Sequence, residues 1–260
     1  MKKNLLIVAG DQAYAINGLN FYIEKLAAEY NIYIIEEKKM GLKNILSAIR
    51  SILKKRGIIT TIDCILYVIY RALTAKPTKP QKTYSPHLIV NSINSVEAQN
   101  WLQQYRADIV IANGCSLMDK KTIKIIGVPI LNAHPGVNPR YRGTGNISAI
   151  LENNFHLIGS TIHYIDEGID TGKIVYIDLI KINDMPSDYN DLEEYVYMRC
   201  WYYMCDFILN GKTFIPEEAK NLTSKIYPSS GLSSLLKAKS NYKNMSLLCS
   251  QATKANKLDL

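Results

Sequence analysis

Short apolar runs that end in glycine or in polar residues are the feature that most constrains the fold of this chain. The first run, NLLIVAG (4–10), ends in glycine and is followed by an amphipathic stretch from Gly18 to Tyr30, where we expect a helix. A second run, NIYIIEE (31–37), has the composition of a strand. A strand, helix and strand in this order predict a mostly parallel α/β sheet flanked by helices, with a ligand crevice at the carboxyl ends of its strands.

Further strands are expected downstream. They are HLIVNS (87–92), ADIVIANG (107–114) and VPILNAH (128–134), with a helix from Ser95 to Tyr105 after the first of them. Because these runs end in small or polar residues, we expect Asn113, Gly114, Asn132 and His134 to converge at one edge of the sheet.

The sequence predicts a catalytic domain over residues 1–210 and a short C-terminal extension over 211–260. Within the domain, residues 40–86 form a helical insertion, with two helices broken near Gly57 and a proline-containing connector over 76–86. A further helix is expected from Asp188 to Asn210, packed on the core. The last 45 or so residues are rich in Ser, Lys and Asn, and we expect only short, loosely attached elements there.

Charge and hydropathy restrict the function classes. The net charge of +8 favours anionic ligands such as phosphates or carboxylates. No run approaches the roughly 18 consecutive apolar residues of a membrane span, and Asp11 ends the apolar run near the N-terminus. We therefore expect no membrane span and a cytoplasmic protein. The insertion's basic residues indicate either a membrane-surface or lid segment or, more simply, a solvated helix face.

The motif LNAHPG (131–136) carries the first candidate catalytic residues. On a strand that ends here, Asn132 and His134 alternate onto the same face, so that an amide and an imidazole point into one pocket. Two such donors near one oxygen can stabilise a developing oxyanion, each at about 3 to 4 kcal/mol.

A second motif supplies a carboxylate. GSTIHYID (159–166) and KIVYIDL (173–179) alternate as strands do, and EGIDTG (167–172) has turn composition. Asp170 is therefore expected in a tight turn between these two strands, where backbone N–H groups can keep its carboxylate ionised and direct it at a histidine. A carboxylate beside an imidazole raises the histidine pKa and can accept a proton through water.

Each of these three residues also has a purely structural interpretation, and the pattern gains specificity only when they occur together. Among the other histidines, we expect His163 to pack against its neighbours, His87 to lie at a strand start and His156 to lie in a polar loop. The five cysteines are scattered and are expected to be reduced, and Cys115 lacks a sequence context that would activate it. The histidines have no ligand spacing, so no metal is expected.

LNAHPGVNPRYRG followed by GSTIHYIDEGIDTGKIV resembles the folate-dependent formyltransferases, a family that includes methionyl-tRNA, glycinamide ribonucleotide and sugar N-formyltransferases. The resemblance is clear over residues 107–180 and extends as a Rossmann-like pattern back to residue 1. It implies transfer of a formyl group from 10-formyltetrahydrofolate to a primary amine. By this resemblance, His134 would polarise the formyl oxygen and help to protonate the intermediate. Asn132 would hold that oxygen, and Asp170 would orient His134 and help to remove the amine proton.

The resemblance also implies contacts with the two substrates. Asn113, Gly114, Leu117 and Asp166 would lie on the folate side. Tyr141 and Arg142, in RYRG, are candidates for stacking and phosphate contacts with the acceptor, although Arg142 is equally suited to anchoring its loop.

Two departures from the family narrow the acceptor. The first loop, AGDQAYAINGLNF (9–21), lacks the phosphate-binding glycines typical of the glycinamide ribonucleotide enzymes, and the tail after 210 is short for the tRNA-binding barrel of the methionyl-tRNA enzymes. We therefore expect a phosphate-bearing small-molecule amine, first of all a nucleotide-linked amino sugar of the kind used in lipopolysaccharide or O-antigen biosynthesis, and no tRNA. Glycinamide ribonucleotide or another small amine is the alternative acceptor, and a homodimer stays open.

Two other classes of protein fit the sequence less well than an enzyme does. A non-catalytic module that binds folate or a nucleotide would not need Asn132, His134 and Asp170 together. A membrane-surface or nucleic-acid protein acting through the basic helix at 38–56 would leave the motifs at 131–172 unexplained.

Overall fold

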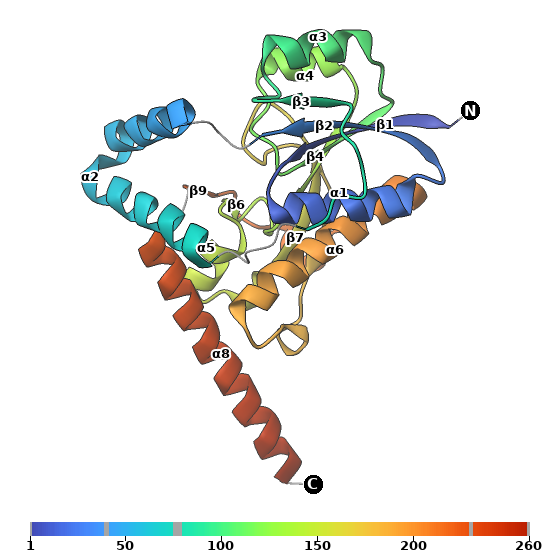
Figure 1. The fold of residues 1–260 in the computed structure, drawn as a ribbon. Coiled ribbons are helices and arrows are strands. Elements are labelled where there is room, and N and C mark those ends of the chain that lie inside the picture. Colours follow the sequence, from blue (N-terminus) through green and yellow to red (C-terminus); the bar gives the residue numbers. More distant parts are fainter. Residues whose placement is uncertain (1, 39–41, 75–79, 229–230, 259–260) are drawn as a thin grey trace.

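A seven-stranded sheet forms the centre of the protein in the computed structural model, which describes residues 2–38, 42–74, 80–228 and 231–258 (Figure 1). The strand order is β3-β2-β1-β4-β5-β7-β8. Strands β1 (Lys3–Gly10), β2 (Tyr30–Glu37), β3 (Leu88–Val90), β4 (Ile109–Asn113) and β5 (Ile130–His134) are parallel. Strand β7 (Gly159–Tyr164) runs antiparallel to both of its neighbours, β5 and β8 (Ile174–Leu179). The predicted mostly parallel α/β sheet is confirmed.

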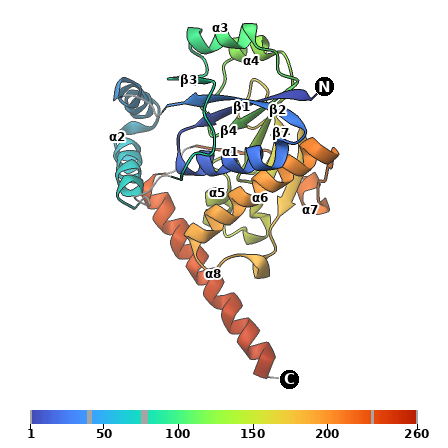
Figure 2. The same cartoon turned by 45° about the vertical axis from the view of Figure 1, so that its right-hand side comes forward.

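Helices cover both faces of the sheet (Figure 2). On one face, α1 (Ala13–Leu26) and α6 (Tyr189–Asn210) pack on a core that includes Leu5, Ile7 and Ile111. On the other face, α3 (Val96–Gln104) and α4 (Lys120–Ile126) cover Leu6 and Val8. Alternate side chains of β1 thus enter different cores, as the two-residue period of a strand requires.

Shorter elements complete the fold. They are β6 (Arg142–Gly143), α5 (Asn146–Leu151), η1 (Phe155–Leu157), η2 (Ile182–Asp184), α7 (Glu217–Lys220) and β9 (Ile226–Tyr227). β6 pairs with β9, which attaches the segment after α6 to the loop that follows β5.

Helix α1 begins earlier than predicted, because only Asp11 and Gln12 separate it from β1. Gly18, the predicted start, instead lies inside the helix and is buried. A Cβ atom there would come within 2.6 Å of Nε1 of Trp201 in α6, so glycine allows the two helices to approach closely.

The insertion forms α2 (Leu42–Thr74), which is interrupted at Gly57, where φ is 79°. The predicted break near Gly57 is therefore correct. Within Ile49–Thr74, an 18-residue window has a mean hydropathy of 1.4 and holds at most two charged residues, so by length and composition alone the helix could cross a membrane. This corrects the expectation that no segment qualifies as a span, because the basic residues gather before Gly57. Residues 76–79 of the predicted connector lie outside the described residues.

The C-terminal extension differs from the prediction. Instead of short, loosely attached elements, residues 232–258 form the long helix α8 (Leu232–Leu258), which projects from the body (Figure 1). Its first half packs through Leu235, Ala238, Tyr242 and Met245, all buried, against a surface that includes α5. These residues recur at helical spacing, so a polar composition concealed an apolar stripe.

Candidate active site

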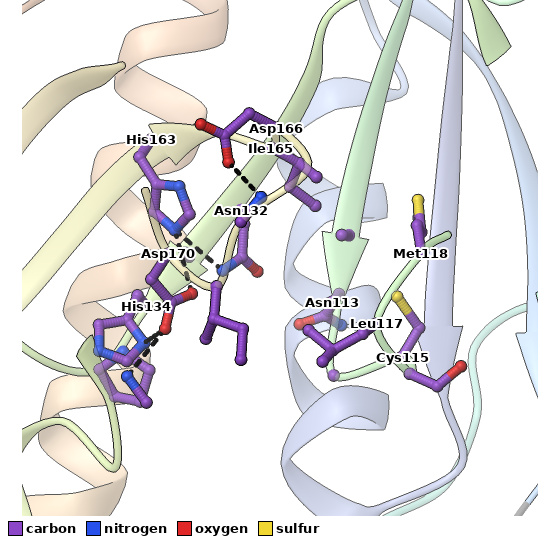
Figure 3. A pocket seen from close by; sticks show the side chains of 18 of the residues that line it. Asn113, Cys115, Leu117, Met118, Asn132, His134, His163, Ile165, Asp166 and Asp170 are labelled. Carbon is purple, nitrogen blue, oxygen red and sulfur yellow. Dashed lines mark hydrogen bonds and ion pairs between the residues drawn. The ribbon is translucent and has the colours of Figure 1, made fainter. Parts of the chain in front are cut away.

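The carboxyl ends of β4 and β5 and the turn between β7 and β8 enclose a pocket of about 490 Å³ (Figure 3). Asn132, His134 and Asp170 all line it, as do the four residues expected on the folate side. The pocket therefore lies where parallel strands of an α/β sheet expose their carboxyl ends.

Asn132 and His134 reach the pocket from alternate positions of β5, as the strand period predicts. Nε2 of His134 lies 2.9 Å from the carbonyl oxygen of Tyr141. Because a carbonyl can only accept, this contact assigns the proton of the neutral ring to Nε2 and leaves Nδ1 free to accept one.

Nδ1 of His134 lies 3.5 Å from Oδ2 of Asp170. Burial is the main influence on His134 and lowers its pKa, while the charge of Asp170 opposes this shift. His134 is therefore neutral near pH 7, and its protonated form would be stabilised by the adjacent carboxylate.

Asp170 occupies the left-handed region with φ of 51°, a conformation that aspartate tolerates better than most residues. Its Oδ2 atom accepts a hydrogen bond from the backbone N–H of Gly143 at 3.0 Å. Burial would raise the pKa of Asp170, but interactions with His163, His134 and Gly143 outweigh it and lower the pKa to about 2. The carboxylate is thus ionised throughout the neutral range.

His163 belongs to this cluster, contrary to the expectation that it only packs against neighbours. Its Nε2 atom lies 3.2 Å from Nδ2 of Asn132 and 3.6 Å from Oδ1 of Asp170. Its Nδ1 atom lies 2.8 Å from the carbonyl oxygen of Tyr164, which assigns the proton of the neutral ring to Nδ1 and lets Nε2 accept from the Asn132 amide. His163 therefore fixes the orientation of the Asn132 amide.

Two glycines allow the loop after β5 to close over the histidine. A Cβ atom on Gly136 would lie 2.7 Å from Nε2 of His134 and 2.5 Å from the Cα atom of Gly145. Gly145 has φ of 59°, and a Cβ atom there would lie 2.1 Å from the carbonyl oxygen of Pro135. Neither position has space for a side chain, so these residues hold the backbone against the ring of His134.

Some of the expected folate-side residues use their polar groups within the protein, whereas another offers a free surface to a ligand. Nδ2 of Asn113 donates to the carbonyl oxygen of Ala15 at 2.7 Å and so ties β4 to α1. Oδ1 of Asp166 accepts from the N–H of Gly168 and from the hydroxyl of Thr171, so it shapes the turn. Leu117 is 69% exposed and offers the pocket an apolar surface.

Gly114 also lines the pocket, with φ of 70°. A Cβ atom there would lie 2.8 Å from the ring of Tyr14, so glycine lets this aromatic ring approach the backbone closely.

The structure does not place Tyr141 and Arg142 among the residues that line this pocket, and the burial of the Tyr141 ring corrects its expected stacking on the acceptor. The Tyr141 side chain is buried, and its hydroxyl donates to Glu152 at 3.0 Å. Arg142 donates from Nη1 to the carbonyl oxygen of Ile169 at 3.2 Å. Arg142 therefore anchors the loop that bears Asp170, while Tyr141 serves the site through its carbonyl oxygen.

An aromatic wall of Tyr14, Tyr197 and Trp201 was missed in the sequence. The rings of Tyr14 and Tyr197 stack with centroids 4.8 Å apart, and Trp201 continues the stack 6.2 Å from Tyr197. All three line the pocket, so α6 contributes to the site as well as to the core. Their spacing at 197 and 201, one helical turn, was the available signal.

The cysteine in the pocket is unsuited to act as a nucleophile. Burial raises the pKa of the Cys115 thiol to about 12, so the reactive thiolate is scarce at neutral pH. Among the described residues, no group of three or more histidine, cysteine or acidic side chains is placed to hold a metal ion. Asn132, His134 and Asp170 offer the pocket groups that transfer protons and form hydrogen bonds.

Comparison with solved structures shows the fold. A sugar N-formyltransferase from Shewanella sp. FDAARGOS_354 aligns with a TM-score of 0.51 at 13% identity, covering 86% of this chain and 76% of the other. Phosphoribosylglycinamide formyltransferase from Bacillus halodurans aligns with a TM-score of 0.53 at 16% identity, covering 81% and 97%. At such low sequence identities, these structural alignments show a shared fold and nothing more.

Sequence comparison extends this result. Methionyl-tRNA formyltransferase from Finegoldia magna is 27% identical over 184 residues, which are 70% of this chain and 51% of the relative. The chain thus matches about half the length of that relative. Residues 63–197, slightly more than half of the chain, match the family described as formyl transferase. The chain belongs to the formyl transferase family.

Proposed function

We propose that the protein transfers a formyl group from 10-formyltetrahydrofolate to a primary amine. The observation that carries this proposal is the convergence of Asn132, His134 and Asp170 in one pocket, with Nδ1 of His134 facing a carboxylate. A neighbour of the same fold, the N-formyltransferase from Helicobacter canadensis, is described in complex with folinic acid and dTDP-3-aminofucose. This description supports a folate as the donor.

The donor supplies an activated formyl carbon on a nitrogen that leaves as an amine. The acceptor nitrogen forms the new C–N bond and loses one proton, and the departing nitrogen gains one. His134 is suited to the first transfer because its neutral ring can take a proton at Nδ1, next to Asp170. As an imidazolium it can then return that proton to the leaving nitrogen.

Asn132 has a different role in the proposed mechanism. Its Nδ2 atom is directed by His163, and its amide can hold the formyl oxygen as negative charge develops there. A donor fixed in place before the reaction stabilises the transition state more than the ground state, because it requires no reorganisation.

The aromatic wall gives the pocket a surface for a planar ring. Tyr14, Tyr197 and Trp201 line the same pocket as the catalytic cluster. Stacked aromatic side chains favour offset stacking with another ring. We assign this wall to a ring of one of the two substrates, either the folate or the acceptor base.

For the acceptor, we propose an amino sugar linked to a nucleoside diphosphate. A net charge of +8 suits a diphosphate, and the loop after β1 lacks the glycines that would cradle a ribonucleotide phosphate. Glycinamide ribonucleotide is the alternative acceptor.

The test is incubation of the protein with 10-formyltetrahydrofolate and a panel of amines, following tetrahydrofolate by absorbance and the product by mass. The panel contains dTDP- and UDP-linked 3-amino and 4-amino sugars, glycinamide ribonucleotide and methionyl-tRNA, and the variant His134→Asn is the control. Formylation of a nucleotide-linked sugar supports the whole proposal, whereas formylation of glycinamide ribonucleotide or methionyl-tRNA alone refutes the sugar assignment. Folate binding without turnover of any amine would indicate a binding module.

A further inference from the structure

The second half of α2 carries an apolar stripe that faces away from the protein. After Gly57, apolar residues recur every three or four positions, as on one side of a helix. The stripe consists of Ile58, Ile59, Ile62, Leu66, Ile69 and Leu73, and each of these side chains is between 45% and 81% exposed. Soluble proteins seldom expose so many contiguous large apolar side chains without a partner for them.

The polar side of the same helix holds it to the body. Asp63 accepts from the backbone N–H and the hydroxyl of Ser233 in α8, at 2.9 and 2.6 Å. Arg71 donates to Glu193 of α6 at 3.1 Å. These contacts fix which side of the helix faces the protein, so the exposure of the apolar stripe is set by the fold.

Charge is distributed around the stripe rather than within it. Between 58 and 74 the charged residues are Asp63 and Arg71, and both are engaged with the body. Lys54, Lys55 and Arg56 come just before Gly57, and the two lysines are exposed. An uncharged apolar face beside exposed lysines is the pattern of a helix that lies in the interface of an anionic membrane.

We propose that α2 docks the protein on an anionic membrane surface, with the apolar stripe in the headgroup and acyl boundary and with Lys54 and Lys55 among the headgroups. The helix lies along the membrane and does not cross it. Residues 58–74 would span only about 25 Å, less than the hydrocarbon core of about 30 Å. Crossing would also require Asp63 and Arg71 to abandon their partners in α8 and α6.

A second copy of the chain is the less favoured occupant. A symmetric dimer through this stripe would place the same lysines of both copies at one interface, in a protein with a net charge of +8. An anionic surface instead complements that charge. The proposal concerns α2 alone and is independent of the reaction in the pocket.

The test is co-sedimentation of the full chain with vesicles of phosphatidylcholine, with and without about 30% phosphatidylglycerol. We expect binding to the anionic vesicles, weaker binding to the neutral ones, and a decrease as salt rises from about 0.1 to 0.5 M. Ile59→Glu and Leu73→Glu, at positions that are 81% and 80% exposed, should each weaken binding about tenfold or more. Lys54→Glu combined with Lys55→Glu should weaken binding to anionic vesicles specifically.

Val96→Glu is the matched control, because it places one glutamate at an apolar side chain that is 70% exposed on the distant helix α3. It should bind as the unchanged protein does. Circular dichroism and thermal unfolding should show that all variants are folded. Failure of the unchanged protein to bind, or equal weakening by Val96→Glu, would overturn the proposal. So would resistance of the bound protein to alkaline carbonate, which indicates a span, or a dimer in analytical ultracentrifugation that Ile59→Glu dissociates.

Discussion

Asn132 and His163 occupy directly paired positions on the antiparallel strands β5 and β7, and their side-chain nitrogens lie 3.2 Å apart. This pairing joins the two sequence motifs into one cluster, since His163 also lies 3.6 Å from Asp170. The proposed oxyanion donor, Asn132, is therefore oriented by His163, whereas the proposed proton acceptor, His134, is held by the carbonyl oxygen of Tyr141 and faces Asp170.

Replacing His134 by asparagine should lower kcat by about two or more orders of magnitude, because the side chain that moves the proton is lost. Far-ultraviolet circular dichroism and thermal unfolding should show a folded protein. Near-normal turnover by the purified, folded variant would exclude His134 as the acid and base.

Asp170→Asn should have an effect of similar size on kcat, since it removes the charge that stabilises protonated His134. The change is suited to this position because asparagine also tolerates the left-handed backbone. Measurement of kcat against pH gives a second readout. The charge of Asp170 raises the pKa of His134, so its removal should move the acidic limb of the profile to lower pH. An acidic limb at the same pH in both proteins would contradict this coupling.

Asp170 should also contribute to the stability of the fold in a pH-dependent way. Its pKa is lowered from 3.8 to about 2 in the folded chain, so its contribution is present above about pH 4 and is lost as the pH falls towards 2. The shift corresponds to roughly 2 kcal/mol. Urea unfolding at pH 7 and pH 3 detects about half of this contribution, roughly 1 kcal/mol, and Asp170→Asn should show a smaller difference between the two. An equal difference would refute the linkage.

His163→Leu should lower kcat by about tenfold while changing KM less than about twofold, because it releases the Asn132 amide without removing a group that touches the reacting atoms. His163→Gln, which keeps an acceptor for that amide, should recover part of the loss. If the two variants lose the same activity and the same stability, His163 acts only as a packing residue.

The C-terminal helix should be integral to the fold. Leu235→Ala, which removes a fully buried side chain, should reduce the free energy of unfolding by about 2 to 5 kcal/mol. Leu236→Ala is the matched control, because the adjacent side chain is 48% exposed. Equal unfolding midpoints for the two variants in urea would show that α8 does not contribute to the core.

Local patterns in the sequence predict the sheet and the three central residues of the site. Alternation places Asn132 and His134 on one side of β5, and turn composition places Asp170 between two strands. Both patterns depend on a few neighbouring residues, so they can be recognised in the sequence without knowledge of the tertiary structure. The break at Gly57 was visible for the same reason.

The features that were missed depend on long-range register or on packing. The role of His163 requires the pairing of β5 with β7, which no local pattern specifies. Tyr141 appeared to face an acceptor, but its ring turns into the core and only its carbonyl oxygen meets His134. The stripe of α8 was obscured by the serines and lysines between its buried residues.

The lack of space at Gly136 and Gly145 makes the loop after β5 intolerant of substitution. Any side chain at either glycine would collide with His134 or with the backbone of Pro135, so a change in this loop would displace the histidine before it changed specificity. The pocket has no such restriction at Leu117, whose side chain is largely open to solvent. A new acceptor is therefore more readily accommodated, by natural selection or by design, through changes on the β4 side of the cavity.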